Sequence, residues 1–381
     1  RAPPERYGVI LAWTVIALAG GWVAFAYVGY PLVLALLARV SPRPVAAGDV
    51  APSLSVVVAV HNGAHALKAK LERTLALEYP RPLEVVVASD GSTDGTDDVA
   101  REFAARGVRL VRNERREGKE AAQALGIQHA SGDVLVFTDV TAELSPDALR
   151  QIVRPFADPA VGCVSSEDRV ESGGGEGTYV RYEMALRRLE SRASTLVGLS
   201  GSFFAARREL CTPWRADLAS DFRVALEAGR RGLRAVSEPS ATASFHAISD
   251  PAAEWRRKVR TVRRGIAVLA AYRDLLHPRH GRVALSLWGH KLARFTAPFA
   301  LLALLLASGF AAGSSALAAA LFAGQLAAYA LGALSLVLPG VARLAPARLF
   351  GFFMLVNASM LVAWGYHWSG RRAVTWDPTR R

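Results

Sequence analysis

Four aspartates lie at the end of one apolar run and in the segment directly after it in this 381-residue chain. Residues 85–98 read VVVASDGSTDGTDD, so a run of valines passes into Asp90 and then into a turn rich in Gly, Ser, Thr and Asp. The segment could be an ordinary solvent-exposed turn, because these residues supply the backbone angles that turns require. A calcium-binding loop of the EF-hand type is excluded, because Arg101 stands where that motif needs a bidentate glutamate. A nucleotide site remains, since ligands of open α/β sheets bind beyond the carboxyl ends of strands.

A second oxygen-rich strand end follows at residues 133–141, which read DVLVFTDVT. The apolar run ends in Asp139, and Thr141 comes two residues later, so both side chains point to the same side of an extended chain. Oxygen ligands of this kind suit Mg²⁺ or Mn²⁺ bound to a diphosphate. Asp-x-Thr is very common by itself, and it becomes informative only beside Asp90 at the end of another strand.

Basic residues outnumber acidic ones by 46 to 33, and the densest cluster, WRRKVRTVRR, occupies residues 255–264. Such a cluster can bind anionic lipid headgroups or steer an anionic substrate. We expect no nucleic-acid partner, because neither a DNA-binding motif nor an aromatic stacking platform accompanies it. The two cysteines, Cys163 and Cys211, form no disulfide or metal framework by their spacing, which fits a reducing, cytosolic location.

Short Val-rich segments alternate with helical ones between residues 44 and 282. We expect strands at residues 53–60, 83–89, 108–112 and 133–139, and helices at residues 64–77, 96–105 and 119–130. Strands that alternate with helices predict a parallel sheet with right-handed crossovers, an architecture that often binds nucleotides. The two acidic strand ends would then meet at one edge of the sheet.

Long runs without charge flank this middle region, at residues 7–38, 295–342 and 349–370. A bilayer crossing needs about 20 apolar residues, so these runs predict one span before the middle region and about three after it. The first run is too long for a signal-peptide core, which usually has about 7–15 residues, and we read it as a retained anchor. The expected domains are residues 1–43, 44–282 and 283–381.

The ordered motifs SVVVAVHN, VVVASDGSTDGT and GKEAAQALGIQHASGDVLVFTD resemble the nucleotide-sugar half of an inverting family 2 glycosyltransferase. The later stretches GEGTYVRYEMALRRLES, GLSGSFFAARREL, SDFRVAL and HKLARFTAP are similar to those of its membrane-embedded members, which include cellulose, chitin and hyaluronan synthases. The resemblance implies an α/β GT-A fold, a Rossmann-like cytosolic domain that binds a nucleotide sugar, joined to α-helical transmembrane segments.

The same resemblance assigns the donor site. Asp90 would hold the uridine part of a UDP-sugar, and Asn62 would lie beside the base. Asp139 would bind the Mg²⁺ or Mn²⁺ ion, with Thr141 standing where the family carries a second acid. Lys119, one of only five lysines beside 41 arginines, would contact the donor.

Asp221 of the SDF stretch matches the family's catalytic base, and a helix start would favour its ionised form. The acceptor would bind at the glycine-containing stretch and the helix before it, at Gly198, Ser200, Gly201, Ser202, Tyr182 and Glu183. Processive relatives carry Gln-x-x-Arg-Trp after the base, whereas this chain has only Arg260, Arg263 and Arg264. These arginines would clamp the diphosphate, and the missing tryptophan leaves processivity open.

Three functions remain open. The first is an integral enzyme of the plasma (inner) membrane that adds a sugar to a growing cell-surface polysaccharide. The second is single-sugar transfer to a polyprenyl-phosphate-linked or other lipid acceptor, and the third is an inactive transporter or scaffold. The sugar is not encoded in any motif, and self-association remains open. With the active domain in the cytosol, four spans would put the tail outside, yet its four arginines favour the inside.

Overall fold

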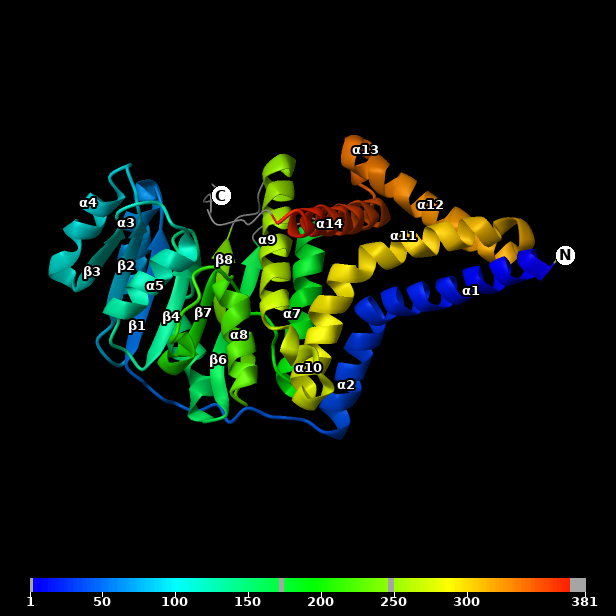
Figure 1. Ribbon diagram of the computed structural model, residues 1–381. Coiled ribbons are helices and arrows are strands. Elements are labelled where there is room, and N and C mark those ends of the chain that lie inside the picture. The colour runs from blue at the N-terminus through cyan, green and yellow to red at the C-terminus, as the bar shows by residue number, and fades with distance from the viewer. Residues whose placement is uncertain (1–2, 171–174, 246–249, 371–381) are drawn as a thin grey trace.

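The computed structural model describes residues 3–170, 175–245 and 250–370. Figure 1 shows an α/β domain at one end and a bundle of long helices extending from the other, with the start of α1 at the far tip. Helices α7 (Gly175–Ala193) and α9 (Pro251–Ala271) stand between these two parts. The expected division into a compact α/β domain and flanking apolar helices is therefore visible in the architecture.

One eight-stranded sheet forms the centre of the α/β domain, in the order β3-β2-β1-β4-β7-β6-β8-β5. Strands β3, β2, β1 and β4 are parallel to one another. Strand β7 runs antiparallel to both of its neighbours, β4 and β6. The strands are β1 Leu54–Val60, β2 Glu84–Asp90, β3 Val108–Asn113, β4 Val134–Asp139, β5 Glu143–Leu144, β6 Val161–Val170, β7 Phe203–Arg207 and β8 Arg234–Phe245.

The Val-rich strands form because both faces of the sheet are covered. Every residue of β1 is buried, and successive residues pack into different cores. Val56 and Val58 contact α3 (Ala64–Leu75), α4 (Thr96–Glu102) and α6 (Ala148–Val153) in one core. Val57 and Ala59 belong to the other core, with α5 (Lys119–His129) and α8 (Ser220–Arg230). A strand buried on both faces reads as a continuous apolar run, which is what the sequence displays.

The predicted elements of the first half are confirmed, with changes at their ends. Helix α4 gives way after Glu102 to a short 3₁₀ turn, Ala104–Arg106, and α3 ends two residues earlier than expected. The prediction of a parallel sheet is confirmed for the four strands on which it was based, β1 to β4, and β7 enters the middle of the sheet antiparallel. This strand is short and lies far along the chain, so the βα alternation of the first half carried no sign of it.

Four helical segments of the described residues are long and apolar enough to cross a membrane: Tyr7–Val40, Arg282–Ser314, Ala316–Val337 and Ala345–Trp368. The first combines α1 (Pro3–Ala24), a π-helical turn (Phe25–Gly29) and α2 (Tyr30–Val40). The second combines α10 (Arg282–Ser286), another π-helical turn (Leu287–Leu292) and α11 (Ala293–Ala311). In Figure 1 both segments bend near these turns, so that α2 and α10 lie beside α7 while α1 and α11 run outward.

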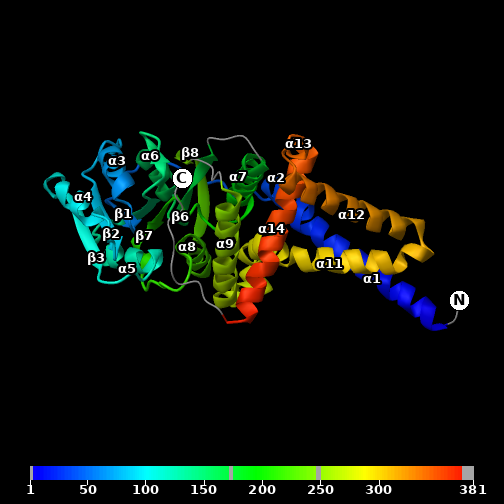
Figure 2. The same ribbon diagram turned by 90° about the horizontal axis from the view of Figure 1, so that it is seen from above.

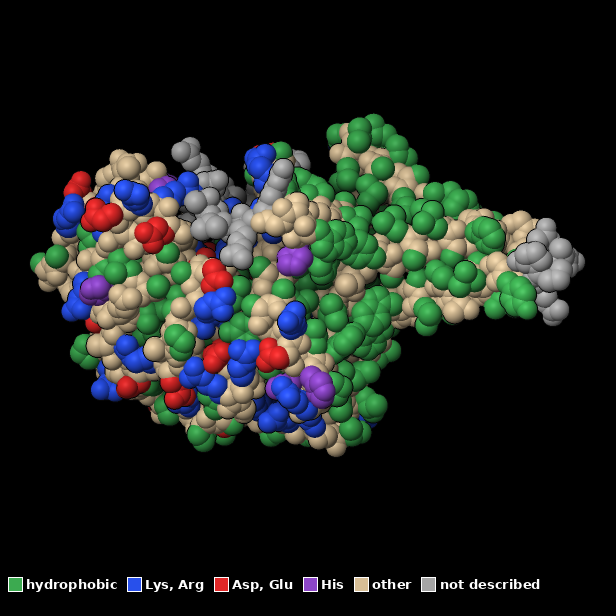
Figure 3. All heavy atoms as spheres, viewed as in Figure 1, with side chains coloured by type: hydrophobic (Ala, Val, Ile, Leu, Met, Phe, Trp, Pro, Cys, Tyr) green, Lys and Arg blue, Asp and Glu red, His purple; other side chains and the backbone are tan. Residues whose placement is uncertain are grey.

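The two bends pack directly against each other. Tyr30 is fully buried, and a Cβ atom added to Gly289 would lie only 2.1 Å from its ring. Only glycine fits at that position without moving the tyrosine. Figure 3 shows hydrophobic side chains covering the extension while charged side chains gather on the α/β domain, as expected for a helical bundle in a lipid environment.

Helix α14 (Ala345–Trp368) differs in direction from the other apolar helices. In Figure 2 it runs across the line of α1, α11 and α12 (Ala316–Val337), and in Figure 1 it is foreshortened. It follows α13 (Pro339–Ala342) and crosses α12 closely, because a Cβ added to Gly332 would lie 3.0 Å from the carbonyl oxygen of Phe350. Trp364 of α14 donates a hydrogen bond to the Phe295 carbonyl of α11 (2.8 Å), which fixes this crossing.

Candidate active site

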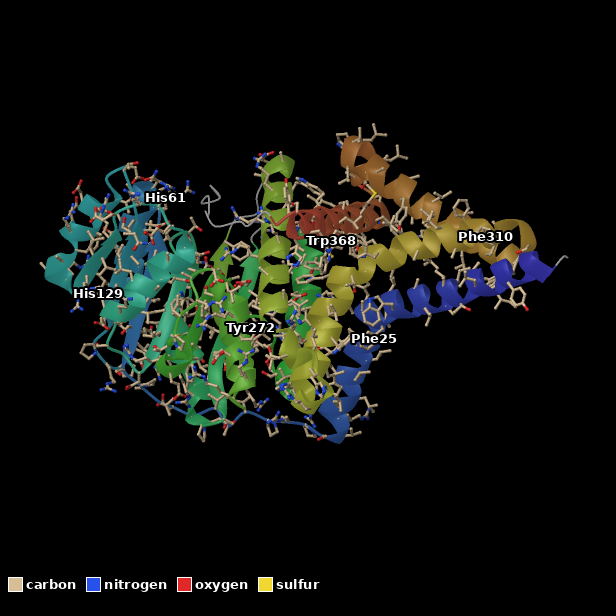
Figure 4. All side chains as sticks on the ribbon, viewed as in Figure 1. Phe25, His61, His129, Tyr272, Phe310 and Trp368 are labelled. Atoms are coloured by element: carbon tan, nitrogen blue, oxygen red, sulfur yellow. The ribbon has the colours of Figure 1, made fainter. Side chains whose placement is uncertain are left out.

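The polar ends of β1, β2 and β4 meet at one edge of the sheet, as predicted. His61 follows β1, and Figure 4 shows it at the upper edge of the α/β domain. Its Nδ1 lies 2.7 Å from the Asp90 carbonyl oxygen at the end of β2. Asn62, at a positive φ of 48°, accepts a hydrogen bond from the Thr93 amide at 2.8 Å. Asn62 therefore fixes the turn that carries the aspartates.

Three of the four aspartates in that turn form hydrogen bonds or ion pairs with nearby residues. Asp94 accepts hydrogen bonds from the amides of Ala64 and Thr96, both at 3.1 Å, and so joins the starts of α3 and α4. Asp97 is buried and pairs with Arg112. Asp98 is exposed and pairs with Arg101 one turn further along α4. Asp94, Asp97 and Asp98 thus stabilise the turn and the helix that follows it, and the turn is only partly exposed to solvent.

Asp90 is almost fully buried, and its carboxylate faces the loop between β3 and α5. It accepts hydrogen bonds from the backbone amides of Glu117 (2.9 Å) and Gly118 (2.7 Å) and from the side-chain amide of Asn113 (3.2 Å). Asp90 thereby fixes the loop that leads into Lys119, and a role towards a nucleoside stays a prediction.

Lys119 and Asp139 form an ion pair at the centre of this edge. The Lys119 ammonium lies 2.5 Å from the Asp139 carboxylate, and their side chains are 11% and 30% exposed. The same ammonium donates a hydrogen bond to the Gly201 carbonyl at 3.0 Å. The Asp139 amide in turn donates to the Ser202 carbonyl at 3.0 Å. Two predicted donor residues are therefore in contact with the predicted acceptor stretch.

A buried lysine lies beneath this pair. The Lys70 ammonium donates hydrogen bonds to the Thr138 hydroxyl (2.9 Å) and the Ala142 carbonyl (2.7 Å), so it spans the turn that carries Asp139 and Thr141. Burial lowers the pKa of Lys70 to about 7, although the nearby Asp139 charge acts in the opposite direction. The sequence analysis missed Lys70, because a lysine within an amphipathic helix ordinarily faces water.

The metal prediction rests on Asp139 with Thr141. Among the described residues, no group of three His, Cys, Asp or Glu side chains could hold an ion alone. Mg²⁺ commonly binds through one or two carboxylates together with substrate phosphates and water, so the partly exposed Asp139 carboxylate fits an ion that arrives with a diphosphate. Thr141 as a ligand stays a prediction.

Asp221 lies in the first turn of α8. A Cβ added to Gly201 would lie 3.3 Å from the Asp221 carboxylate oxygen. The Leu199 amide donates to the Asp221 carbonyl at 3.2 Å. Gly201 therefore separates Asp221 from the Lys119–Asp139 pair, and the absence of a side chain leaves the carboxylate accessible from this stretch.

Asp168, near the end of β6, shapes the other side of the glycine-containing stretch and was not singled out from the sequence. Its carboxylate accepts hydrogen bonds from the hydroxyls of Ser200 (2.6 Å) and Ser202 (2.7 Å). Asp168 lies within β6 and follows Ser166 and Glu167, so the rule that selected Asp90 and Asp139, an aspartate at the end of an apolar strand, does not select it. The predicted acceptor serines thus have an anionic partner within the protein.

The remaining predicted acceptor residues, Tyr182 and Glu183, lie against the apolar helices. Tyr182 donates to the Tyr27 carbonyl at 3.0 Å. Glu183 accepts hydrogen bonds from His290 (2.5 Å) and Arg294 (2.7 Å). Burial alone would raise the pKa of Glu183, but these two charges hold it well below its usual range. The structure places both residues in the contact between α7 and the apolar helices, and their acceptor role stays a prediction.

The predicted arginine clamp divides along α9. Arg264 forms an ion pair with Glu120, the residue after Lys119, so it reaches the donor side. Arg263 lies over the ring of Tyr366 in α14, with 4.9 Å between the guanidinium carbon and the ring centroid. Arg260 also interacts with a neighbouring group. Arg264 thus contacts the nucleotide half of the domain, whereas the ring contact of Arg263 is with α14.

A solved structure with this overall arrangement is a mannosyltransferase from Pyrobaculum calidifontis, in complex with GDP-Man and Mn²⁺. The two chains are 26% identical and superpose with a TM-score of 0.73, over 94% of this chain and 100% of the other. This likeness includes the helical extension, because it covers nearly the whole chain.

Two relatives have related activities in their names. A poly-beta-1,6-N-acetyl-D-glucosamine synthase of Staphylococcus epidermidis is 27% identical over 39% of this chain and 38% of its own length. An undecaprenyl-phosphate 4-deoxy-4-formamido-L-arabinose transferase of Pectobacterium carotovorum is 30% identical over 26% of this chain and 32% of its own. The chain thus spans less than half the length of these curated relatives.

The family model described as glycosyl transferase family 2 matches residues 55–212. The matched segment runs from β1 through β7, and it contains Asp90, Lys119, Asp139 and the glycine-containing stretch. Asp221 and the apolar helices lie outside the matched segment. Residues 55–212 of this chain are therefore a glycosyl transferase family 2 domain.

Proposed function

We propose that this protein transfers a sugar, with inversion, from a nucleotide sugar to an acceptor at a membrane surface. The observation that carries the proposal is the position of Gly201. Its carbonyl oxygen contacts Lys119, which pairs with Asp139, and its Cα side faces the Asp221 carboxylate. The Lys119–Asp139 pair, which would bind the donor diphosphate, and the Asp221 carboxylate, which would act as the base, thus lie on either side of Gly201.

In the proposed reaction the donor diphosphate lies at Lys119 and Asp139. A divalent ion held by Asp139, with Thr141 as a neutral ligand, would neutralise the diphosphate charge there. The Asp221 carboxylate accepts the proton of the acceptor hydroxyl, whose oxygen bonds to the anomeric carbon. The bond from that carbon to the diphosphate oxygen breaks on the opposite face, so the configuration inverts and the nucleoside diphosphate leaves. General-base assistance of this kind typically contributes about 10²- to 10⁴-fold in rate.

The membrane part of the proposal rests on the four apolar segments and on the hydrophobic surface of the extension. Nucleotide sugars are cytosolic substrates, so the α/β domain would face the cytosol of the plasma (inner) membrane. Basic residues beside the apolar segments, such as Arg39, Arg43 and Arg294, agree with that side. The acceptor is a growing glycan or a lipid-linked sugar, and self-association is not required by the site.

The decisive test is turnover of donors by the purified full chain in detergent or lipid nanodiscs. Release of UDP or GDP from a panel of nucleotide sugars, with Mg²⁺ or Mn²⁺ and an extract of membrane lipids, should identify one preferred donor. Both bases belong in the panel, because the sequence resemblance favours UDP whereas the Pyrobaculum structure contains GDP-Man. Asp139→Asn is the matched inactive control. No release from any donor above that control would refute the proposal.

A further inference from the structure

The glycine-containing stretch, residues 198–202, connects the two halves of the candidate active site. It belongs to no helix or strand, so its position depends on individual hydrogen bonds. Four such bonds attach its backbone to the start of α8, to β6, to α5 and to β4: Leu199 amide to Asp221 carbonyl (3.2 Å), Ser200 amide to Ser165 hydroxyl (2.8 Å), Lys119 ammonium to Gly201 carbonyl (3.0 Å) and Asp139 amide to Ser202 carbonyl (3.0 Å). A shift of this stretch would therefore move the proposed base relative to the proposed donor site.

The two serine side chains of this stretch share one partner, the half-buried Asp168. Both hydroxyls donate to the same carboxylate oxygen, Oδ1, from Ser200 at 2.6 Å and from Ser202 at 2.7 Å. The two hydroxyl oxygens lie only 2.8 Å apart. Because a hydroxyl carries a single proton, both protons are directed at the carboxylate. One acceptor atom therefore fixes the residues on either side of Gly201.

Asp168 stands on a strand that is itself held firmly. Strand β6 lies between β7 and β8 in the sheet. Just before Asp168, the Ser166 hydroxyl donates to the Phe203 carbonyl at 2.7 Å, and Glu167 forms an ion pair with Arg188 of α7 at 2.5 Å. A group on a rigid element holds its partners more precisely than a group on a loop. Asp168 is therefore suited to serve as a fixed point for the irregular stretch beside it.

We propose that Asp168 is a positioning residue for the transfer reaction, acting through Ser200 and Ser202. By holding these two serines it keeps Gly201 in place, and Gly201 in turn lies between Lys119 and the Asp221 carboxylate. This inference rests on the proposed function. In-line transfer needs the base opposite the leaving diphosphate, and a displacement of about 1 Å can cost about 10²-fold in rate. Asp168 exchanges no proton and holds no substrate in this role, so the reaction itself is unchanged.

Two substitutions separate the hydrogen bonds of Asp168 from its charge. Asp168→Asn removes the charge but keeps an oxygen at the Oδ1 position, which can accept both serine protons. Asp168→Ala removes the charge and the acceptor together. A positioning role predicts native behaviour for the asparagine variant and a defect for the alanine variant. Glu167→Gln is the matched control, because the partner of this neighbouring acid lies on α7, and it should behave like native protein.

The first measurement needs no substrate. It is hydrogen–deuterium exchange of the full-length protein in detergent, read by mass spectrometry on peptides that cover residues 198–202. Asp168→Ala should raise the exchange rate there about ten- to a hundredfold, the equivalent of a lost charge-assisted hydrogen bond, while peptides from β1 keep their native protection. The double variant Ser200→Ala with Ser202→Ala removes the same bonds from the other side and should match it. This second variant keeps the test decisive where Asp168→Ala fails to fold.

The second measurement is the rate of transfer, which a purely structural role would not change selectively. In Asp168→Ala, kcat should fall about ten- to a hundredfold. The affinity for UDP or GDP with Mn²⁺, measured by calorimetry, should stay close to native, because Lys119 and Asp139 are still present. Asp168→Asn should retain both the native rate and the native affinity.

Three outcomes would overturn the inference. Native exchange at residues 198–202 in folded Asp168→Ala, or in the double serine variant, would show that these bonds do not hold the stretch. Equal losses in Asp168→Asn and Asp168→Ala would show that the charge acts directly. Weaker binding of UDP or GDP by Asp168→Ala would place Asp168 in the donor site. Failure of the proposed function is distinguishable, because native protein would then release no nucleoside diphosphate whatever the exchange result.

Discussion

Lys70 is predicted to make the stability of the α/β domain depend on pH in an unusual direction. Its ammonium is buried under the turn that carries Asp139, and burial lowers its pKa from 10.5 to about 7. In the unfolded chain the amine stays protonated up to about pH 10.4. Between these two values the unfolded state binds more protons than the folded state, so the free energy of unfolding should rise with pH.

The magnitude follows from that pKa shift. Each pKa unit corresponds to about 1.4 kcal/mol, so the full cost of burying the charged amine is roughly 5 kcal/mol below pH 7 and vanishes above about pH 10.5. The change between pH 7 and pH 9 is roughly 2 kcal/mol. For a domain of this size that corresponds to roughly 4–8 °C in melting temperature. Lys70→Met should remove this component, because methionine fills similar space without an ionisable group.

The assay is thermal unfolding of the full chain in detergent across this pH range. Other groups titrate there as well, so the informative quantity is the native melting temperature minus that of Lys70→Met at each pH. Lys68→Met, on the exposed side of the same helix, is the control and should follow native protein. Donor KM should also rise in Lys70→Met, because the hydrogen bonds to Thr138 and Ala142 that fix the Asp139 turn are lost. Parallel curves for native protein and Lys70→Met would refute the reasoning.

Three further predictions concern the reaction and the membrane. Asp139→Asn should abolish metal-stimulated turnover while the protein remains folded by circular dichroism, and full native activity in excess chelator would contradict the metal role. Asp221→Asn should retain nucleoside diphosphate binding by calorimetry but lose about 10²- to 10⁴-fold in transfer, since an amide cannot accept the acceptor proton; equal loss of binding would instead indicate a structural role. A cysteine introduced at Ser369 should resist a membrane-impermeant thiol reagent in intact cells, and labelling there would show that α14 crosses the bilayer.

The first half of the site was predictable because one rule locates it. Parallel strands bring their carboxyl ends to the same edge, so Asp90 and Asp139 had to lie close to Asn62 once the βα alternation was recognised. Residues 83–89 and 133–139 predicted β2 and β4 within a residue of their bounds. The local sequence pattern and the tertiary contacts agree here, because a strand that is buried on both faces can occupy few other positions in the sheet.

The second half depended on contacts that no local pattern encodes. Lys70 and Asp168 were missed because a lysine in a helix and an acid in a strand are ordinarily surface residues, and their partners in the site come from distant elements. Tyr182 and Glu183 share a helix with Arg187, yet their bonds go to α11 and to the turn after α1. Lys291 lies 70 residues beyond Asp221 in sequence and beside Phe222 in space. Such pairings follow from how α7 and α8 meet the apolar helices, and a single sequence does not specify them.

The direction of α14 bears on a conflict within the sequence itself. Four crossings would put the tail on the outer side, although Arg371 and Arg372 follow the last apolar run. These two arginines lie outside the described residues, but the helix before them runs across α1, α11 and α12 (Figure 2) and packs against α9. If those three helices cross the bilayer, a helix lying across them stays near one surface. The chain would then cross three times, and the tail, Arg343 and Arg348 would share the side of the α/β domain, as the positive-inside rule requires.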